Sequence, residues 1–386
     1  MSIFLYDICI VGGGGHVGFP LGLMFASKNK KTLLYDINNK ILNKIKKGLV
    51  PFKEEKAKLY LKKFKKNIFF SKDLEDIAKC KFIIICIGTP VNKFTLAPDL
   101  KSFYEFIYKL KKKINKNQHI IIRSSVQIGS IKKIYKILST KNITYCPERI
   151  VQGRSIHELP ILPQIISGYS NNSMSIVAKL FKKICKKIIF TSVVEAELIK
   201  LFTNSYRYIN FSISNQLYMM SERLGINFEK LRKNMRDGYE RTFAMPSAGF
   251  ASGPCLLKDT LQVSYFFKNS FTLGDAAVKI NENLPNFIFK NLKKKYNLNS
   301  KIIGVLGLSF KAETDDVRDS LSLKLIEILK KNKIKFFQSD EYYKNKCNVT
   351  ANYLVKESDI IIICVPHKKY KTLKIPKKKV IINTWN

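Results

Sequence analysis

Short apolar runs alternate with amphipathic, lysine-rich stretches over the first half of the chain. The apolar runs have the length and β-branched composition of buried strands, and the stretches between them carry apolar residues at helical spacing. Such alternation is typical of a parallel sheet with helices on its faces. We therefore predict strands at 7–12, 32–36, 82–88, 119–125 and 142–147, separated by helices that include 38–48, 53–66 and 101–114.

The pattern changes near residue 190. From Ser192 to Leu224 the chain has no proline or glycine, and its apolar residues recur at helical spacing. Ser192 and Glu195 have the spacing of a capping box, which begins a helix, and Gly225 is a favourable residue after a helix end. We expect one long helix here, lying between two domains.

A second alternating region begins at residue 301. It predicts a smaller α/β domain, in which a helix at 320–332 accompanies strands at 301–307, 335–340, 359–365 and 379–385.

The formal net charge is +40 at pH 7. A field of this strength either attracts a polyanionic partner or reflects a surface coated with solvated lysines. Basic runs such as KKFKK and KKNKIK are scattered through helix-like segments and are not gathered in one arm. Because no zinc-finger spacing, RNP-like aromatic pattern or basic-zipper heptad accompanies the charge, we favour the lysine coat and do not expect a nucleic-acid partner.

The cysteine pattern favours a cytoplasmic location. The eight cysteines form no CxxC pair, and Cys9, Cys86 and Cys364 lie inside apolar runs, as buried reduced thiols do. The N-terminus lacks the pattern of a signal peptide, and the apolar runs are too short to span a bilayer. We expect a protein that does not associate with a membrane.

A glycine-rich loop follows the first predicted strand. In VGGGGHVGFPLG, Gly13, Gly15 and Gly18 match GxGxxG, and Asp36 ends the second strand. Such glycines allow a tight turn, a close approach of backbone to a pyrophosphate and close helix–strand packing, and the acidic residue accepts hydrogen bonds from a ribose. The pattern favours NAD over NADP, with a glycine-rich turn that binds no ligand as the alternative. Expected cofactor contacts are Gly13, Gly15, His16, Val17, Gly18, Asp36 and, at the end of another strand, Thr89, which otherwise belongs to an ordinary turn.

The octapeptide GPCLLKDT, residues 253–260, places Cys255 after a loop of small residues. By itself this thiol is a packing residue, a metal ligand or a nucleophile. No second cysteine or histidine stands at metal-ligand spacing, so we predict no metal site.

Lys200 and Asn204 are four residues apart in the predicted long helix, so they share one face. A cation and an amide donor on one face suit a developing oxyanion. The alternative is a solvated polar stripe.

Nine motifs occur in one order along the chain: VGGGGHVGFPLG, YDIN, PFKEE, CIGTPV, RSSVQIGS, CPERIVQGRSIHEL, AELIKLFTNSYR, GPCLLKDT and GLSFKAETDDVRDS. Together they resemble the UDP-glucose/GDP-mannose dehydrogenase family over nearly the whole chain. The resemblance implies an α/β fold of two Rossmann-like doubly wound domains joined by a long central helix, in a homodimer. It also implies NAD-dependent oxidation of the C6 hydroxyl of a nucleotide-linked hexose to a carboxylate. The implied parts are an NAD-binding domain at 1–190, a central helical region at 191–298 and a nucleotide-sugar-binding domain at 299–386.

The resemblance also assigns roles to single residues. It implies that Cys255 is the nucleophile that captures an aldehyde as a thiohemiacetal, with Lys258 favouring the thiolate. Asp259 would assist proton transfer or position the hydrolytic water, or be a turn residue. Lys200 and Asn204 would stabilise the oxyanion.

Other implied site residues lie in the two outer domains. Glu148 would act as general base or activate water, unless it is a surface residue. Ser125 stands where the family has threonine, a departure that keeps the hydroxyl. Lys311 and Arg318 would meet phosphates and hydroxyls of substrate or cofactor. Further expected substrate contacts are Arg149, Phe250, which would line the sugar pocket, and Gly253.

Two cues on the sugar conflict. PERIVQGRSIHEL resembles the branch that acts on UDP-N-acetylhexosamines, whereas the Lys-Asp pair after Cys255 resembles UDP-glucose enzymes. We favour UDP-N-acetylmannosamine or UDP-N-acetylglucosamine, with UDP-glucose as the alternative. Rival classes are a single-step β-hydroxyacid dehydrogenase and a basic nucleic-acid-binding protein on a non-catalytic Rossmann scaffold.

Overall fold

The computed structural model describes residues 4–92, 97–268 and 270–385. They form two compact units, residues 1–202 and 203–386, and each unit is described by itself below.

The first unit is built on an eight-stranded sheet with the order β3-β2-β1-β4-β5-β6-β7-β8. The five strands predicted from the sequence are confirmed as β1, β2, β4, β5 and β6. They form here because β-branched residues favour strands and turn-forming segments separate the runs. The strand bounds are β1 Tyr6–Val11, β2 Thr32–Tyr35, β3 Ile68–Ser71, β4 Cys80–Ile85, β5 His119–Ile122, β6 Ile143–Tyr145, β7 Gln164–Gly168 and β8 Ile188–Phe190.

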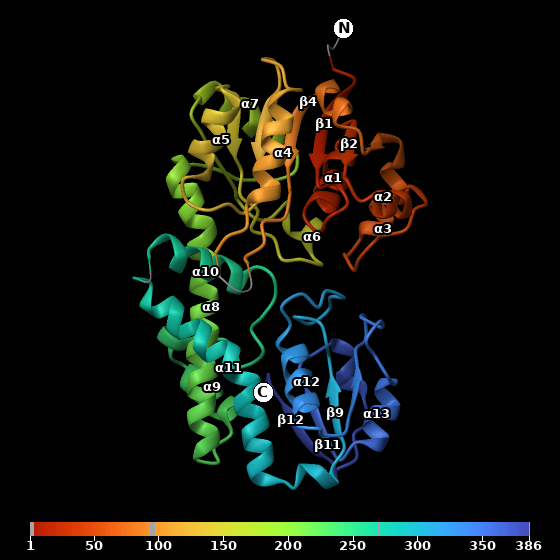
Figure 1. The fold of residues 1–386 in the computed structure, drawn as a ribbon, viewed down its shortest axis with the longest axis vertical. Helices are drawn as coiled ribbons and strands as arrows, with labels where there is room; N and C mark the ends of the chain where they lie inside the picture. The colour runs from red at the N-terminus through yellow and green to blue at the C-terminus, as the bar shows by residue number, and fades with distance from the viewer. Residues whose placement is uncertain (1–3, 93–96, 269, 386) are drawn as a thin grey trace. The chain divides into compact units, whose positions relative to one another are not determined.

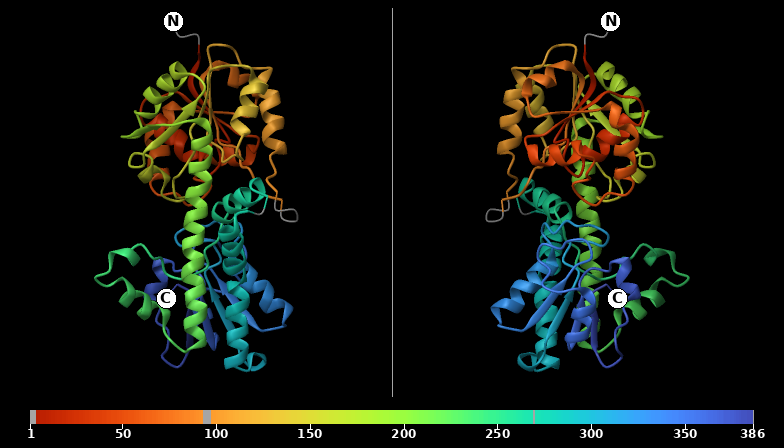
Figure 2. Two further views of the ribbon diagram at one scale, coloured as in Figure 1. Left: turned by 90° about the vertical axis from the view of Figure 1, so that its left-hand side faces the viewer. Right: turned by 90° about the vertical axis from the view of Figure 1, so that its right-hand side faces the viewer.

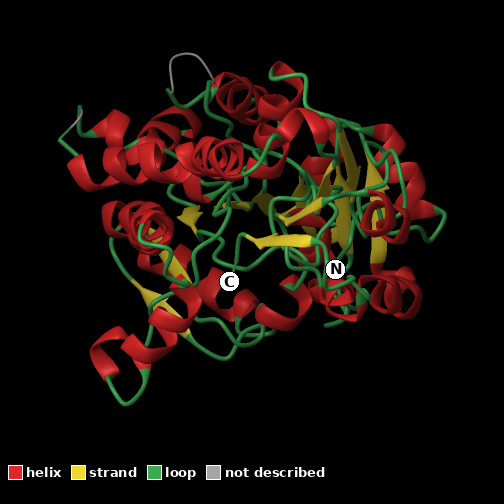
Figure 3. Cartoon of the chain, turned by 90° about the horizontal axis from the view of Figure 1, so that it is seen from below, coloured by secondary structure: helices red, strands yellow, loops and turns green. Residues whose placement is uncertain are grey.

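Helices cover both faces of this sheet (Figures 1 and 3). One core cluster joins the sheet to α1, α3, α6 and α7, and a second joins it to α4 and α5. Burial of a sheet on both faces explains why its strands are continuously apolar. The helices are α1 Gly18–Ala26, α2 Asn39–Lys46, α3 Ala57–Phe64, α4 Lys101–Lys111, α5 Ser130–Leu138, α6 Ser155–Glu158 and α7 Asn171–Phe181, with short 3-10 helices at Lys65–Asn67 and Leu74–Lys79.

One pairing departs from the all-parallel sheet that the alternation predicts. Strand β7 runs antiparallel to β6, with Thr144 opposite Gly168, whereas the other pairs are parallel. A parallel neighbour requires a crossover that returns the chain to the opposite end of the sheet. The only helix between these two strands is α6, a single turn, so the chain turns back at the carboxyl end of β6.

The long helix is confirmed as α8, Val193–Arg223 (Figure 2). Its capping box also forms. The Glu195 amide donates to Ser192 Oγ at 3.3 Å, and the Ser192 amide donates to Glu195 Oε2 at 2.9 Å. Hydrogen bonds from Thr191 first and then Ser192 lower the pKa of Glu195 to about 2. The first turn of α8 therefore carries a carboxylate, which suits a helix N-terminus.

The second unit contains a four-stranded parallel sheet with the order β10-β9-β11-β12, as the second alternating region predicts. Its strands are β9 Ile303–Leu306, β10 Phe336–Ser339, β11 Ile360–Ile363 and β12 Val380–Asn383. Its helices are α9 Phe228–Arg236, α10 Leu256–Phe266, α11 Thr272–Lys295, α12 Leu321–Lys331 and α13 Ala351–Glu357, with 3-10 helices at Glu240–Thr242, Leu298–Ser300 and Lys368–Thr372. The predicted α/β class is confirmed.

Candidate active site

The glycine loop connects β1 to α1 and has no space for a side chain at Gly13 or Gly18. Gly12, rather than Gly13, has the positive φ of +78° that makes the turn. A Cβ on Gly13 would lie 2.8 Å from Leu34 Cα, and a Cβ on Gly18 would lie 2.2 Å from the carbonyl oxygen of Gly12. Gly18 thus allows the helix to pack closely on the strand, as the sequence predicts. His16, within the loop, stacks on Phe52 with ring centroids 3.9 Å apart, and Val17 immediately precedes α1.

Asp36 follows β2 and lies beside this loop. Its Oδ2 accepts a hydrogen bond from the Gly14 amide at 2.9 Å, and its Oδ1 accepts one from the Asn38 amide at 2.9 Å. Each carboxylate oxygen can accept a further bond, and the side chain is only half-buried. These groups fit a dinucleotide, since the loop leaves backbone free of Cβ atoms where a pyrophosphate binds and the carboxylate can accept from ribose hydroxyls.

Two loops at the carboxyl end of the same sheet meet through a hydrogen bond. Thr89, which follows β4, donates from Oγ1 to the carbonyl oxygen of Ser125, which follows β5. Thr89 is buried and Ser125 is half-buried. The structure therefore brings together one expected cofactor residue and one expected catalytic residue.

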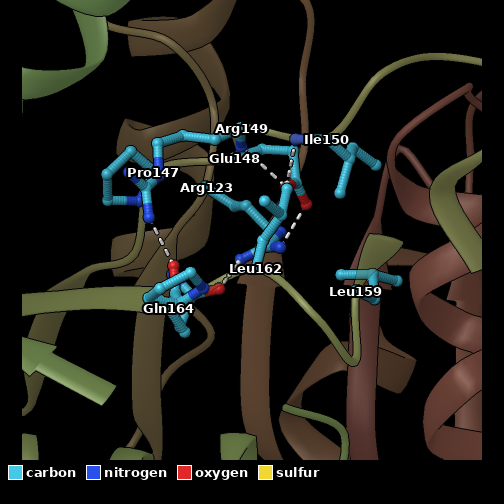
Figure 4. A pocket seen from close by; sticks show the side chains of 9 residues that line it. Arg123, Pro147, Glu148, Arg149, Ile150, Leu159, Leu162 and Gln164 are labelled. Atoms are coloured by element: carbon cyan, nitrogen blue, oxygen red, sulfur yellow. Dashed lines mark hydrogen bonds and ion pairs between the residues drawn. The ribbon is translucent and has the colours of Figure 1, made fainter. Parts of the chain in front are cut away.

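Glu148 follows β6 and is held by several donors (Figure 4). Oε2 accepts from Arg123, and Oε1 accepts from the amides of Arg149 at 2.7 Å and Ile150 at 3.0 Å. The Arg149 guanidinium donates to the Pro163 carbonyl at 2.5 Å, and burial lowers its pKa. These residues line a small, open pocket together with Leu159, Leu162 and Gln164.

Lys200 and Asn204 lie on α8, and both side chains are more than nine-tenths buried. A solvated polar stripe, the alternative for this pair, does not fit such burial. Glu197, on the same helix, accepts from the amides of Gly129 at 2.7 Å and Ile131 at 2.9 Å, at the beginning of α5. Burial raises the pKa of Glu197. Glu197 thereby joins α8 to the loop that carries Ser125.

In the second unit, Cys255 is exposed and stands immediately before α10. The loop ahead of it packs on the loop after β9. The Gly253 amide donates to the Asp319 carbonyl at 3.3 Å, and a Cβ on Gly253, whose φ is +99°, would lie 2.3 Å from the Phe310 ring. Only glycine fits there. The thiol is therefore attached to the C-terminal sheet through this contact, and it lies at a helix N-terminus, which suits a negative charge.

Asp259 lies one turn into α10 and is completely buried. Its Oδ2 accepts a hydrogen bond from Asn204 Nδ2 at 2.6 Å, and its Oδ1 lies 3.2 Å from Lys258 Nζ. Two expected catalytic residues, 55 positions apart in sequence, are thus in direct contact. Lys258 therefore engages the carboxylate, in addition to any effect on the thiol that the sequence predicts.

Arg318 and Lys311 lie on the loop after β9. Arg318 forms a bidentate pair with Asp316. Hydrogen bonding to Asp316 is the main cause that raises the pKa of Arg318, and Cys255 makes a smaller contribution in the same direction. The Arg318 side chain remains 56% exposed, so it is available to an anionic group. Lys311 Nζ lies 5.8 Å from the centre of the Phe310 ring.

Phe250, an expected substrate contact, lies in the core of the second unit. Its side chain is 1% exposed and belongs to the apolar cluster around the C-terminal sheet. The ring packs in the core because it follows the turn at Gly249, whose amide and carbonyl both bond to Asn215 of α8. Its place in the sugar pocket stays a prediction.

Several residues that hold the site have no local sequence pattern. Asn215 fixes the start of the loop that leads to Cys255, Glu197 fixes α8, and Arg123 contacts Glu148. The one available signal was a charged or amide residue within an apolar context, as in HIIIRSS and AELI. His367, given no role from sequence, is buried and bonds to Asp340 at 3.2 Å.

Comparison with known proteins gives matches over nearly all of the chain. Three models of the UDP-glucose/GDP-mannose dehydrogenase family match: its NAD binding domain at 6–185, its central domain at 194–283 and its UDP binding domain at 304–386. A UDP-N-acetyl-D-mannosamine dehydrogenase of Pyrococcus horikoshii is 28% identical over 397 residues, which cover 97% of this chain and 94% of the relative.

Two further matches bear on the fold and the sugar. The solved structure of UDP-D-ManNAc dehydrogenase from Pyrococcus horikoshii has a TM-score of 0.88 at 27% identity and covers 98% of this chain and 95% of its own. A UDP-glucose 6-dehydrogenase of Rickettsia bellii is 26% identical, over 96% of this chain and 92% of the relative. Among the residues that the structure describes, no helix is long and apolar enough to cross a membrane, and no group of three or more His, Cys, Asp or Glu side chains could hold a metal ion.

Proposed function

The chain belongs to the UDP-glucose/GDP-mannose dehydrogenase family, and on this premise we propose that it oxidises the C6 hydroxyl of a UDP-N-acetylhexosamine, UDP-N-acetylmannosamine first, to the uronic acid. The names of several relatives and the segment PERIVQGRSIHEL support this sugar. UDP-glucose is the alternative, supported by the Rickettsia relatives and by the Lys-Asp pair after Cys255. The family matches support three functional regions at 1–190, 191–298 and 299–386.

One observation carries the reaction: an exposed thiol, Cys255, begins the helix whose next turn holds the buried Asp259. Conversion of CH–OH to a carboxylate removes two hydrides and adds the oxygen of one water. NAD, when bound, accepts one hydride in each oxidation. The Cys255 thiolate adds to the carbonyl carbon of the aldehyde, and the second oxidation converts the resulting thiohemiacetal to a thioester. Water then attacks the acyl carbon, the C–S bond breaks, and the thiolate is restored.

Buried polar groups would stabilise the negative charge that develops on oxygen. Lys200 and Asn204 supply an ammonium and an amide donor from one face of α8, and low exposure strengthens both. Asp259 orients the Asn204 amide through their 2.6 Å hydrogen bond and assists proton transfer at the sulfur or the water. Arg318 and Lys311 would bind phosphate or hydroxyl groups.

Glu148 and Ser125 would act at the carboxyl end of the N-terminal sheet. Because both oxygens of Glu148 already accept hydrogen bonds, the geometry favours a fixed acceptor for a substrate or water hydroxyl. Its role as general base stays a prediction. Ser125 would position water through its hydroxyl.

A panel of nucleotide sugars tests the proposal. UDP-N-acetylmannosamine, UDP-N-acetylglucosamine, UDP-glucose and GDP-mannose are each incubated with the protein and NAD, and NADH formed per sugar consumed is measured. We expect a ratio near two, on a UDP-N-acetylhexosamine. A ratio near one would favour a single-step dehydrogenase, and no NADH from any sugar combined with tight DNA binding would favour the non-catalytic alternative.

We also propose a homodimer that pairs along α8. Tyr206, Ile213 and Met220 recur every seven residues and are 65%, 49% and 52% exposed. A seven-residue apolar repeat on a long helix is the pattern that pairs two helices, and an exposed apolar stripe favours a protein partner.

A cytoplasmic location accords with the need for a reduced, exposed Cys255 thiol.

The dimer predicts that Ile213→Lys will produce monomers, because a lysine in the middle of the stripe places a charge in the buried seam. Molar mass from light scattering after size-exclusion chromatography measures the change. The matched control is Ile381→Lys on β12, since that isoleucine is 48% exposed and lies off the stripe. A dimeric Ile213→Lys protein would contradict this interface.

A further inference from the structure

Arg123 is among the largest fully buried side chains of the described structure. It follows β5 directly, in the apolar run HIIIRSS, and its side chain is 1% exposed. An arginine is always charged in proteins, and a buried charge is costly unless partners surround it. Because burial of this charge costs free energy, the groups that Arg123 contacts indicate its role.

The Arg123 guanidinium contacts groups at the end of the sheet where β6 finishes and β7 begins. Nη1 donates to the Cys146 carbonyl at 3.2 Å, after β6, and to Gln164 Oε1 at 2.8 Å, at the start of β7. Its flat face lies over the Phe181 ring, 5.3 Å from the centre. Two hydrogen bonds from Nη1 and the Phe181 ring therefore hold the guanidinium before any contact with Glu148 is considered, whereas the buried Nε has no hydrogen-bond partner among the described residues.

Nη2 of this fixed guanidinium donates to Glu148 Oε2 (Figure 4). The amides of Arg149 and Ile150 hold the other oxygen. We propose that Arg123 is a positioning residue for the oxidation, which holds the Glu148 carboxylate in the single orientation that the substrate requires, with Gln164 fixing the guanidinium. This inference rests on the proposed function of Glu148.

A role confined to stability is the rival explanation. The location favours positioning, because the pair lies at the carboxyl end of a parallel sheet, where ligands bind in this type of fold. The same end carries Thr89 and Ser125. A carboxylate with free torsions there would be misplaced by an ångström or more, and misplacement of that size lowers rates about a hundredfold.

Four variants of the full chain separate the two explanations. Arg123→Ala removes the guanidinium, whereas Arg123→Lys keeps the charge but cannot reach Glu148, Gln164 and the Cys146 carbonyl together. Glu148→Gln removes the carboxylate. The fourth variant combines Arg123→Ala with Glu148→Gln. Arg154→Ala is the matched control, since this exposed arginine belongs to the same segment as Glu148. The measurements are kcat and KM for the active sugar of the panel, together with the melting temperature.

We expect kcat of Arg123→Lys and Arg123→Ala to fall about a hundredfold, with a smaller change in KM, and free guanidinium to restore part of the rate of Arg123→Ala. Arg154→Ala keeps the wild-type rate. The double variant should have a kcat less than about threefold below that of Glu148→Gln alone, because the two residues act as one unit. The proposal would be overturned if the kcat decrease of the double variant equalled the product of the two single decreases. It would also be overturned if Arg123→Lys had a lower melting temperature and an unchanged kcat.

A chemical measurement decides the question without turnover. Water-soluble carbodiimide with an amine nucleophile modifies accessible carboxylates, and mass spectrometry locates the product. We expect Glu148 to resist modification in the wild type and to react in Arg123→Lys, whereas Glu158, which accepts from the Val151 amide at 2.6 Å, reacts equally in both. Equal labelling of Glu148 in both proteins would overturn the proposal. If the wild type oxidises no sugar but the labelling changes as expected, the proposed function fails and the Arg123–Glu148 positioning stands.

Discussion

Replacing Cys255 with serine will lower the steady-state rate of NADH formation by about a thousandfold or more. A serine hydroxyl is un-ionised at neutral pH, so it cannot add to the aldehyde as the thiolate does, and the second oxidation loses its thiohemiacetal. Loss of a covalent nucleophile commonly costs this much or more. NADH absorbance under saturating sugar and NAD measures the effect.

The control for this variant is Cys347→Ser. The Cys347 sulfur accepts from the Asp340 amide and donates to the Tyr343 carbonyl, both at 3.0 Å, and a serine hydroxyl can do both. We expect that protein to retain wild-type turnover. If Cys255→Ser instead forms two NADH per sugar at the wild-type rate, the thioester mechanism is wrong.

Replacing Asp259 with alanine will lower the free energy of unfolding of the second unit by about 3 kcal/mol or more. The carboxylate is completely buried, and its removal takes away the acceptor of the Asn204 amide and a close charge partner of the Lys258 ammonium, which is 15% exposed. A buried ion pair that loses one partner typically costs this much. Urea unfolding followed by circular dichroism measures the change.

Asp259→Asn separates stability from chemistry. Its side-chain oxygen can still accept from Asn204, so we expect a smaller loss of stability, whereas turnover should fall because no carboxylate remains to exchange a proton. Asp237→Ala, at an exposed aspartate after α9, is the control and should change the free energy by less than about 0.5 kcal/mol. Similar values for Asp237→Ala and Asp259→Ala would show that burial of the Asp259 carboxylate contributes little.

Elements with a strong local pattern could be predicted from sequence. The α8 helix is an example, because Ser192 and Glu195 specify its start and the absence of proline and glycine allows its length. The glycine loop is another, since Gly18 must approach the Gly12 carbonyl whatever the rest of the chain does. In both, the deciding contacts lie within a few residues.

Features that depend on distant partners could not be predicted in this way. The antiparallel β7 follows from the shortness of α6, and the contact between Asn204 and Asp259 joins positions 55 apart. The burial of Phe250 depends on Asn215, which holds the preceding turn so that the ring enters the core. Local pattern does not encode which of two apolar surroundings an aromatic ring will occupy.

The contact of Gly253 with Phe310 has a consequence for the order of events in turnover. It attaches Cys255 to the unit that contains the UDP binding domain, whereas the glycine loop belongs to the other unit. On the proposed chemistry, a half-oxidised sugar is anchored twice within one unit, by its nucleotide and by a covalent bond to sulfur. The sugar would then keep its place on this unit between the two oxidations, so the reactive aldehyde need never diffuse away.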